Sequence, residues 1–354
     1  MRRPRPRHRR MADVTANTRT LDDIAAQLPP APARRTLARL TGHGMGALVA
    51  LAIVFVVGVA RSVAFATPEN LLNVLRQNSM VGLVALGMTF VILTGGIDLS
   101  VGAVLAVAGV VAAALSPQGT LVAVAGGLGV AAVLGLVNGL LVTRARIQPF
   151  VVTLATMIAA RGAALAFTGE QSIRVDAAAG GIAWLGRGTI GPLPVPVVLL
   201  FAAYAVGWTV LRHRPFGRHV YAVGDDEQAA RLLGLRADRV LLGVYVVSGA
   251  LAGLAGIVLA GRLGAGQPVA GTGWELDAIA AVVVGGTVLT GGRGGAGLTL
   301  VGVLLLGLIL NLLNLEGTIS PWWQWVVRGV FLLGVVVVQA RVQRSADAGV
   351  GAGG

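Results

Sequence analysis

The sequence contains no cysteine among its 354 residues. This absence excludes disulfides, thiolate metal sites and iron–sulfur clusters. Histidine is also scarce, and His8, His43, His213 and His219 fall in expected tails or loops, away from any HExxH pair or comparable ligand spacing. We therefore predict no metal site.

Lysine is absent as well, so the formal net charge of +13 comes entirely from arginine. A phosphate-binding P-loop needs a lysine after its second glycine, so this chain cannot contain that motif. No GxSxG elbow or other catalytic constellation occurs, and we expect neither enzyme activity nor a cofactor of its own. Any ATP used would be bound by another subunit.

Charged residues make up only 12% of the chain, whereas 55% are hydrophobic. A soluble domain has roughly twice that charged fraction. Apolar runs such as 195–211 and 240–260 match the roughly 20 residues that cross a bilayer core. Arginine-rich loops are common beside membrane spans, so the positive charge gives no reason to expect a nucleic-acid partner.

The fold expected from these runs is an all-α polytopic membrane protein that lies in a lipid bilayer. We predict ten spans, at 46–60, 79–94, 100–116, 119–142, 149–168, 194–211, 240–261, 276–290, 296–314 and 322–340. Five spans in each half would also suit a five-plus-five inverted repeat.

Three domains and one orientation follow from the position of arginine. Residues 1–45 are predicted as a disordered Arg-rich tail, 46–340 as the membrane domain and 341–354 as a C-terminal tail. Arginine concentrates in the loops 143–148 and 212–239 and in both tails. Because arginine marks the cytoplasmic side, both termini are predicted to be cytoplasmic.

Two predicted spans are short and end at glycine pairs. The second span runs into Gly95-Gly96, and the eighth runs through Gly285-Gly286 towards a glycine-rich stretch at 291–295. Paired broken segments in the two halves of a membrane protein indicate a solute pathway. Tight cytoplasmic turns explain the same pattern equally well. Elsewhere, abundant glycine indicates close helix packing.

Polar residues within or beside the spans are candidates for that pathway, because burying them in lipid is costly. The candidates are Thr94, Asp98, Asn138, Arg161, Glu275 and Asp277. Asp98 could instead cap the helix that follows Ser100. Arg161 could pair with an acid on another helix or extend towards the membrane surface. Arg328 is a further charge, within the tenth span.

The loop 212–239 contains a predicted short amphipathic helix. Acidic residues follow Gly224 and suit a helix start, and Gly234 suits its end. The helix could dock on a cytoplasmic partner or lie on lipid. For docking, the residues are Gly224, Asp225, Asp226, Glu227, Ala229, Ala230, Leu232 and Gly234.

Four stretches resemble the inner-membrane permeases of ribose-, xylose- and arabinose-type ATP-binding cassette importers. They are residues 67–107 with TGGIDLSVG, 149–162 with PFVVTLATMIAARG, 216–256 with FGRHVYAVG, and 261–309 with ELDAIAAVVVGG. The resemblance implies a monosaccharide permease of the bacterial cytoplasmic membrane that forms a homodimer with a second permease chain. It also implies two partners, a cytoplasmic sugar-type ATPase and an extracytoplasmic sugar-binding protein. It also implies that the segment 224–234 docks on the ATPase.

Other functions remain open at this stage. The solute could be a nucleoside or another small polar metabolite. An ion-coupled secondary transporter would need carboxylates deep in the spans, and only Asp98 qualifies. A membrane-embedded enzyme would need a nucleophile with a base or a metal set, which the sequence lacks.

Overall fold

The computed structural model describes residues 32–317 continuously, with residues 320, 323, 326, 329, 330, 333 and 334 beyond them. Residues 1–42 and 43–354 form separate units, and the following concerns the second. The predicted tail at 341–354, Arg328 and most of the span 322–340 lie outside the described residues. The first described helix begins at Pro32, inside the predicted tail 1–45. The predicted domain bounds stay predictions.

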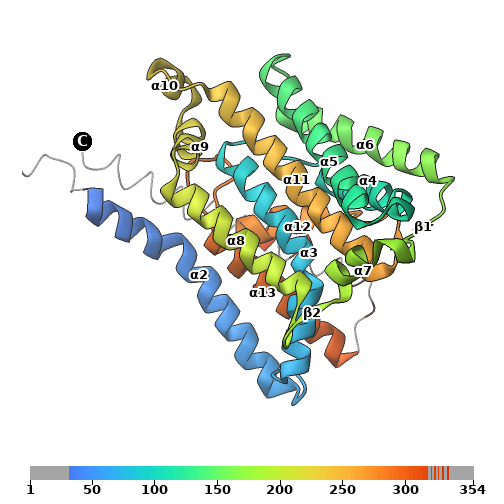
Figure 1. The fold of residues 1–354 in the computed structure, drawn as a ribbon. Helices are drawn as coiled ribbons and strands as arrows, with labels where there is room; N and C mark the ends of the chain where they lie inside the picture. Colours follow the sequence, from blue (N-terminus) through green and yellow to red (C-terminus); the bar gives the residue numbers. More distant parts are fainter. Residues whose placement is uncertain are drawn as a thin grey trace, which may run out of the picture. The chain divides into compact units, whose positions relative to one another are not determined.

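Helices make up most of the described chain (Figure 1). The α-helices are α2 (Pro32–Arg61), α3 (Pro68–Leu93), α4 (Val101–Ala114), α5 (Thr120–Thr143), α6 (Pro149–Thr168), α7 (Gly180–Arg187), α8 (Val195–His213), α9 (Pro215–Asp225), α10 (Glu227–Leu232), α11 (Ala237–Leu263), α12 (Trp274–Val284) and α13 (Ala296–Glu316).

The remaining elements are short and lie between helices. The 3-10 helices are η1 (Ser116–Gln118) and η2 (Ala177–Ala179), and the strands are β1 (Ile173–Arg174), β2 (Thr189–Ile190), β3 (Leu193–Pro194) and β4 (Ala265–Gly266). β1 pairs with β4 and β2 with β3, both antiparallel.

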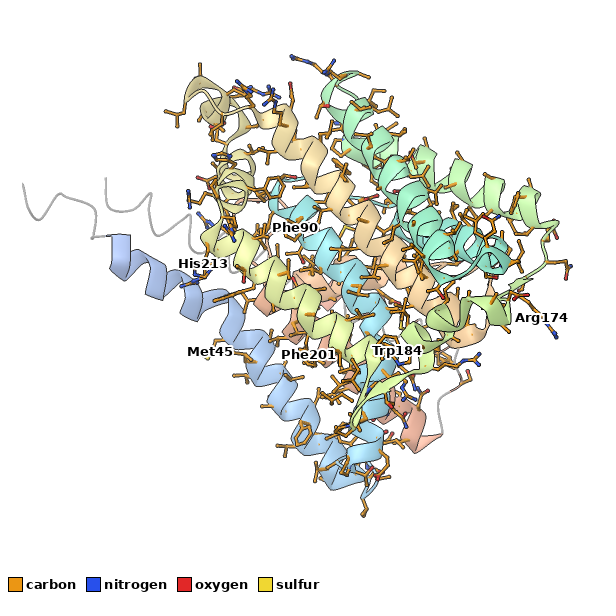
Figure 2. All side chains as sticks on the ribbon, viewed as in Figure 1. Met45, Phe90, Arg174, Trp184, Phe201 and His213 are labelled. Atoms are coloured by element: carbon orange, nitrogen blue, oxygen red, sulfur yellow. The ribbon has the colours of Figure 1, made fainter. Side chains whose placement is uncertain are left out.

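Six of the described helices are long and apolar enough to cross a membrane: α3, α5, α6, α8, α11 and α13. The shorter apolar segments Met45–Arg61 and Val101–Ala114 coincide with two more predicted spans. Side chains such as Met45, Trp184 and Phe201 are about half exposed on the outside of the helices (Figure 2). The prediction of an all-α multi-pass membrane protein is confirmed.

Two predicted spans had the wrong bounds. The span predicted at 79–94 belongs to a helix that begins at Pro68, and polar side chains near the start of this helix bond to other groups of the protein. Asn70 and Asn311, for example, exchange hydrogen bonds of 2.9 Å in both directions. The span predicted at 276–290 ends at Val284, since Gly286 has a φ of +95° and leaves the helical region. Among the helices that coincide with predicted spans, the shortest are therefore α4 and α12.

Helix α11 lies at the centre and packs against α3, α4 and α5 (Figure 1). Glycine permits these approaches, as sequence analysis predicted: a Cβ on Gly256 would lie 2.1 Å from the carbonyl oxygen of Leu105 on α4. Buried side chains of α3 and α11, including Met80, Leu83 and Val258, fill one shared apolar core. This packing holds the end of α3 in a fixed position, where the first glycine break begins.

Candidate functional site

The two glycine breaks meet in the folded chain. The backbone N–H of Gly292, in the loop between α12 and α13, donates to the carbonyl oxygen of Leu93 at the end of α3, over 3.0 Å. Gly95 packs beside Thr290, where an added Cβ would lie 3.3 Å from the Thr290 carbonyl oxygen. The breaks form one junction, which we name the glycine junction (94–96 and 285–295).

Helix α9 lies directly on the glycine junction (Figure 1). A Cβ on Gly224 would lie 1.8 Å from the carbonyl oxygen of Leu93 and 2.7 Å from the nitrogen of Gly292. The Tyr221 hydroxyl donates to the Gly294 carbonyl oxygen over 2.9 Å. Burial raises the pKa of Tyr221, which keeps this donor protonated. One helix thus contacts both breaks.

Sequence analysis missed α9 as a helix and assigned Gly224 and Asp225 to the start of the docking helix. Gly224 and Asp225 instead form the end of α9. The available signal was Pro215 at a helix start, followed by apolar residues at helical spacing, Phe216, Val220 and Val223. Val220 and Val223 are buried, and the ring of Phe216 stacks on Phe90 of α3.

The segment predicted to dock on a partner contains α10, which is shorter than the predicted helix. Asp226 caps it, accepting from the backbone N–H of Ala229 over 2.9 Å, and Gly234 follows with a φ of +83°. Ala230 is buried, whereas Leu232 and Leu233 are 89% and 83% exposed. The residues of the predicted apolar face therefore do not share one environment: Ala230 packs against the protein, and the two leucines point away from it.

A polar pocket of about 810 Å³ lies between α10 and the loop 143–148. Its lining includes Thr94, Arg146, Asp226, Arg231 and Tyr245. The pocket places the two Arg-rich loops at the same end of the membrane domain, as the predicted orientation requires. Thr94, a predicted pathway residue, lies here and donates to the Val91 carbonyl oxygen over 2.8 Å.

Asp98 and Asn138 belong to one buried hydrogen-bond network. Asp98 Oδ1 accepts from the nitrogen and hydroxyl of Ser100, over 3.0 and 2.6 Å, and Oδ2 accepts from Ser248 over 2.8 Å. Asn138 donates to the Ser100 hydroxyl over 2.9 Å and accepts from Thr156 over 2.6 Å. The network connects α4, α5, α6 and α11, and Asp98 is 1% exposed.

Arg161 and Glu275 lie near the start of α12. Arg161 donates to the carbonyl oxygens of Pro268 and Ala270, over 2.6 and 2.7 Å. Sequence analysis considered an acidic partner or the membrane surface and missed these backbone acceptors. Glu275 accepts from the nitrogen of Gly273 over 3.2 Å and lies close enough to interact electrostatically with Arg161. Both residues fix the loop that leads into α12.

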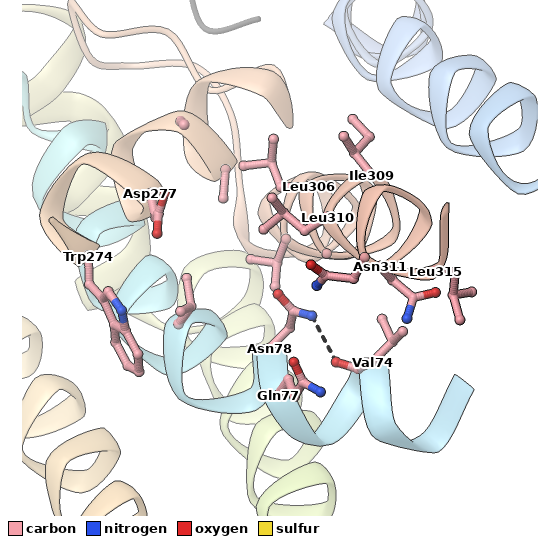
Figure 3. A pocket seen from close by; sticks show the side chains of 16 residues that line it. Val74, Gln77, Asn78, Trp274, Asp277, Leu306, Ile309, Leu310, Asn311 and Leu315 are labelled. Atoms are coloured by element: carbon pink, nitrogen blue, oxygen red, sulfur yellow. Dashed lines mark hydrogen bonds between the residues drawn. The ribbon is translucent and has the colours of Figure 1, made fainter. Parts of the chain in front are cut away.

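Asp277 lines a separate cavity of about 360 Å³ between α3, α12 and α13 (Figure 3). The polar residues on its wall are Gln77, Asn78, Trp274, Asp277, Asn311 and Asn314. Of these, sequence analysis proposed only Asp277. Asn311 and Asn314 lie inside an apolar run, and these polar residues could have indicated the cavity from the sequence. The predicted pathway residues therefore occupy four different places rather than one.

Known proteins resemble this chain over most of its length. A family model described as "Branched-chain amino acid transport system / permease component" matches residues 70–336. The ribose import permease of Bacillus subtilis (strain 168) is 43% identical over 299 residues, which cover 84% of this chain and 92% of that protein.

Two further relatives come from Escherichia coli (strain K12). Its ribose import permease is 41% identical over 300 residues, covering 84% of this chain and 93% of the relative. Its L-arabinose transport system permease is 36% identical over 306 residues, covering 85% and 91%. No solved structure matches the chain.

These matches confirm the resemblance that the four sequence stretches carry. They agree with the helical membrane architecture of the described residues. The chain belongs to the family of permease components of branched-chain amino acid transport systems, and within it to the permeases of sugar importers.

Proposed function

We propose that this chain is the membrane-spanning subunit of an ATP-driven importer for a monosaccharide of the ribose, xylose or arabinose kind. A separate cytoplasmic ATPase binds and hydrolyses ATP, and an extracytoplasmic sugar-binding protein delivers the solute. A second copy of the chain completes the membrane unit. The chain itself has no catalytic role and needs no cofactor.

The observation that carries this proposal is the contact of α9 with both glycine breaks. At Gly224, the backbone of α9 lies directly against the end of α3, with no side chain between them. A partner that pushes on α10 or α9 would therefore displace the end of α3. Rigid packed elements transmit such displacements, whereas a flexible loop absorbs them. The exposed pair Leu232 and Leu233 supplies the apolar surface that a partner would cover.

The absence of lysine supports a separate energy source, because no P-loop can form in this chain. The sugar class rests on the ribose and arabinose relatives, which align over most of their own length. The described polar contacts of Asp98 also fit a structural role better than the coupling carboxylate of an ion-driven transporter.

Reconstitution tests the proposal. Vesicles containing the chain should accumulate labelled D-ribose, L-arabinose or D-xylose only when the cognate ATPase, the binding protein and ATP are all supplied. The purified chain alone should not hydrolyse ATP. Uptake driven by a proton or sodium gradient, without the ATPase, would contradict the importer and support a secondary transporter.

A further inference from the structure

The cavity between α3, α12 and α13 has the chemistry of a solute site, and nothing else described above uses it. It lies on the N-terminal half of α3, around Val74 to Val81. From Asn78 to Leu93 the helix advances about 22 Å, at about 1.5 Å per residue. The cavity is therefore well separated along α3 from the glycine junction, in the direction away from the Arg-rich loops.

The walls of the cavity combine amides with apolar and aromatic surface (Figure 3). An amide side chain both donates and accepts hydrogen bonds, as a sugar hydroxyl does. Trp274 and Leu310 offer apolar surface for the C–H faces of a sugar ring. A cavity of about 360 Å³ lies within the range that small-ligand sites occupy, roughly 300 to 1,000 Å³.

The charge of the lining favours a neutral solute. Among the described lining residues there is no arginine, lysine or histidine, and the one ionisable side chain is Asp277. A carboxylate or phosphate group entering this cavity would lose water without gaining a cationic partner, which is costly. A neutral polyol has no such cost. An amino acid, the solute in the family description, carries the disfavoured carboxylate.

The orientation of Asn78 is fixed by two neighbours. Its Nδ2 donates to the carbonyl oxygen of Val74 over 2.8 Å, which leaves Oδ1 as the acceptor for a solute (Figure 3). Gly307 of α13 packs against this amide, and a Cβ there would lie 2.5 Å from Asn78 Nδ2. The reciprocal bonds between Asn70 and Asn311 hold α3 and α13 at this spacing.

We propose that this cavity binds a neutral monosaccharide, with Asn78 and Gln77 as specificity-determining hydrogen-bonding residues and Trp274 as the apolar wall. The proposal rests on the proposed function for its sugar class. It adds a defined place where the solute is held, and it explains the glycine at position 307 by the position of the Asn78 amide.

The chain has no cysteine, so a single introduced thiol can report on the cavity. We would place it by Val81→Cys, on the cavity wall, in the purified full chain in lipid nanodiscs. Asn73→Cys is the matched control, because Asn73 is exposed on the same helix and is not a lining residue. Labelling rates with a small methanethiosulfonate are measured with D-ribose, L-arabinose, D-xylose or L-leucine.

We expect at least one of the three sugars to slow labelling at position 81 saturably, and not at position 73, with no protection by L-leucine. Adding Asn78→Leu should raise the concentration for half-protection about tenfold, the effect of one lost hydrogen bond. Gly307→Ala should act in the same direction. Gly297→Ala should have no effect, because its Cβ would meet nothing within 4 Å on the same helix.

Three outcomes would contradict the proposed sugar site: protection by L-leucine alone, protection by none of the sugars, or a thiol at position 81 that does not react. This assay needs no ATPase, so its failure is separable from failure of the proposed function. If no sugar protects the thiol but ATP-driven uptake is intact, the proposed site is wrong and the importer function stands. If a sugar protects the thiol but no ATP-driven uptake occurs, the site stands and the importer function is wrong.

Discussion

The backbone N–H of Gly292 and the carbonyl oxygen of Leu93 form a hydrogen bond of 3.0 Å that joins two segments far apart in the sequence. This bond brings the end of α3 and the loop between α12 and α13 under a single helix, α9. Sequence analysis interpreted each glycine break as either a pathway element or a tight turn. The structure adds a third property, because the two breaks together form the surface that α9 contacts.

Gly224→Ala should separate α9 from the glycine junction. The new Cβ would lie 1.8 Å from the Leu93 carbonyl oxygen, so the backbone must move. We expect ATP-driven sugar uptake to fall at least tenfold while the variant still folds and still binds the ATPase. Gly162→Ala is the control, since its Cβ would meet nothing within 4 Å. Wild-type uptake by Gly224→Ala would contradict direct transmission through α9.

Leu232→Asp tests the docking surface of α10. Leu232 is 89% exposed, so the substitution should leave the fold of the permease intact. A charge placed in an apolar interface is costly to desolvate, and we expect most of the ATPase to be lost on co-purification. Arg218→Ala, an exposed change on α9, should have a mild effect. If the ATPase still co-purifies with Leu232→Asp and drives uptake normally, it docks elsewhere.

Asp98→Ala should lower stability. The Asp98 carboxylate accepts three hydrogen bonds inside the protein, and its removal leaves buried hydroxyl and amide groups with fewer partners. Such losses cost about 1 to 3 kcal/mol each when a buried group is left unsatisfied. Thermal unfolding in detergent should show a lower Tm, with a smaller decrease for Asp98→Asn. An unchanged Tm together with lost transport would instead support Asp98 as a pathway residue.

The attachment of α10 to α11 should depend on pH in the acidic range. Arg231 bonds to both Glu227 and Asp238, and its guanidinium holds the pKa of Asp238 below its usual range. A lowered pKa stabilises the folded form above the unfolded pKa of about 3.9, and this contribution is lost as the pH falls through the folded value.

Amide hydrogen exchange at 229–233 measures this attachment. After correction for the intrinsic pH dependence, protection should decrease below about pH 4. The effect should be small, because the pair is largely exposed and solvent screens it. In Asp238→Asn, protection at neutral pH should already show this small decrease. A wild-type level of protection in that variant would show that the ion pair does not hold α10.

Local sequence patterns determined the membrane character of this protein. A run of about twenty apolar residues spans a bilayer wherever it lies in the chain, so hydropathy located the spans that match α3, α5, α6, α8, α11 and α13. The cap at Asp226 and the ending at Gly234 are likewise properties of a few neighbouring residues. The motif stretches identified the family, because they are specific over tens of residues.

The tertiary structure decided which of these segments meet. Asn70 and Asn311 each look unfavourable in an apolar helix, and only their pairing across α3 and α13 makes the longer α3 acceptable in lipid. Asp98 and Ser248 form a network because α11 passes beside the start of α4. Contacts of this kind depend on how helices pack. The periodicity of apolar residues along one helix does not show which other helix packs against it. For the same reason the contact of α9 with the glycine junction and the amide-lined cavity became visible only in the folded chain.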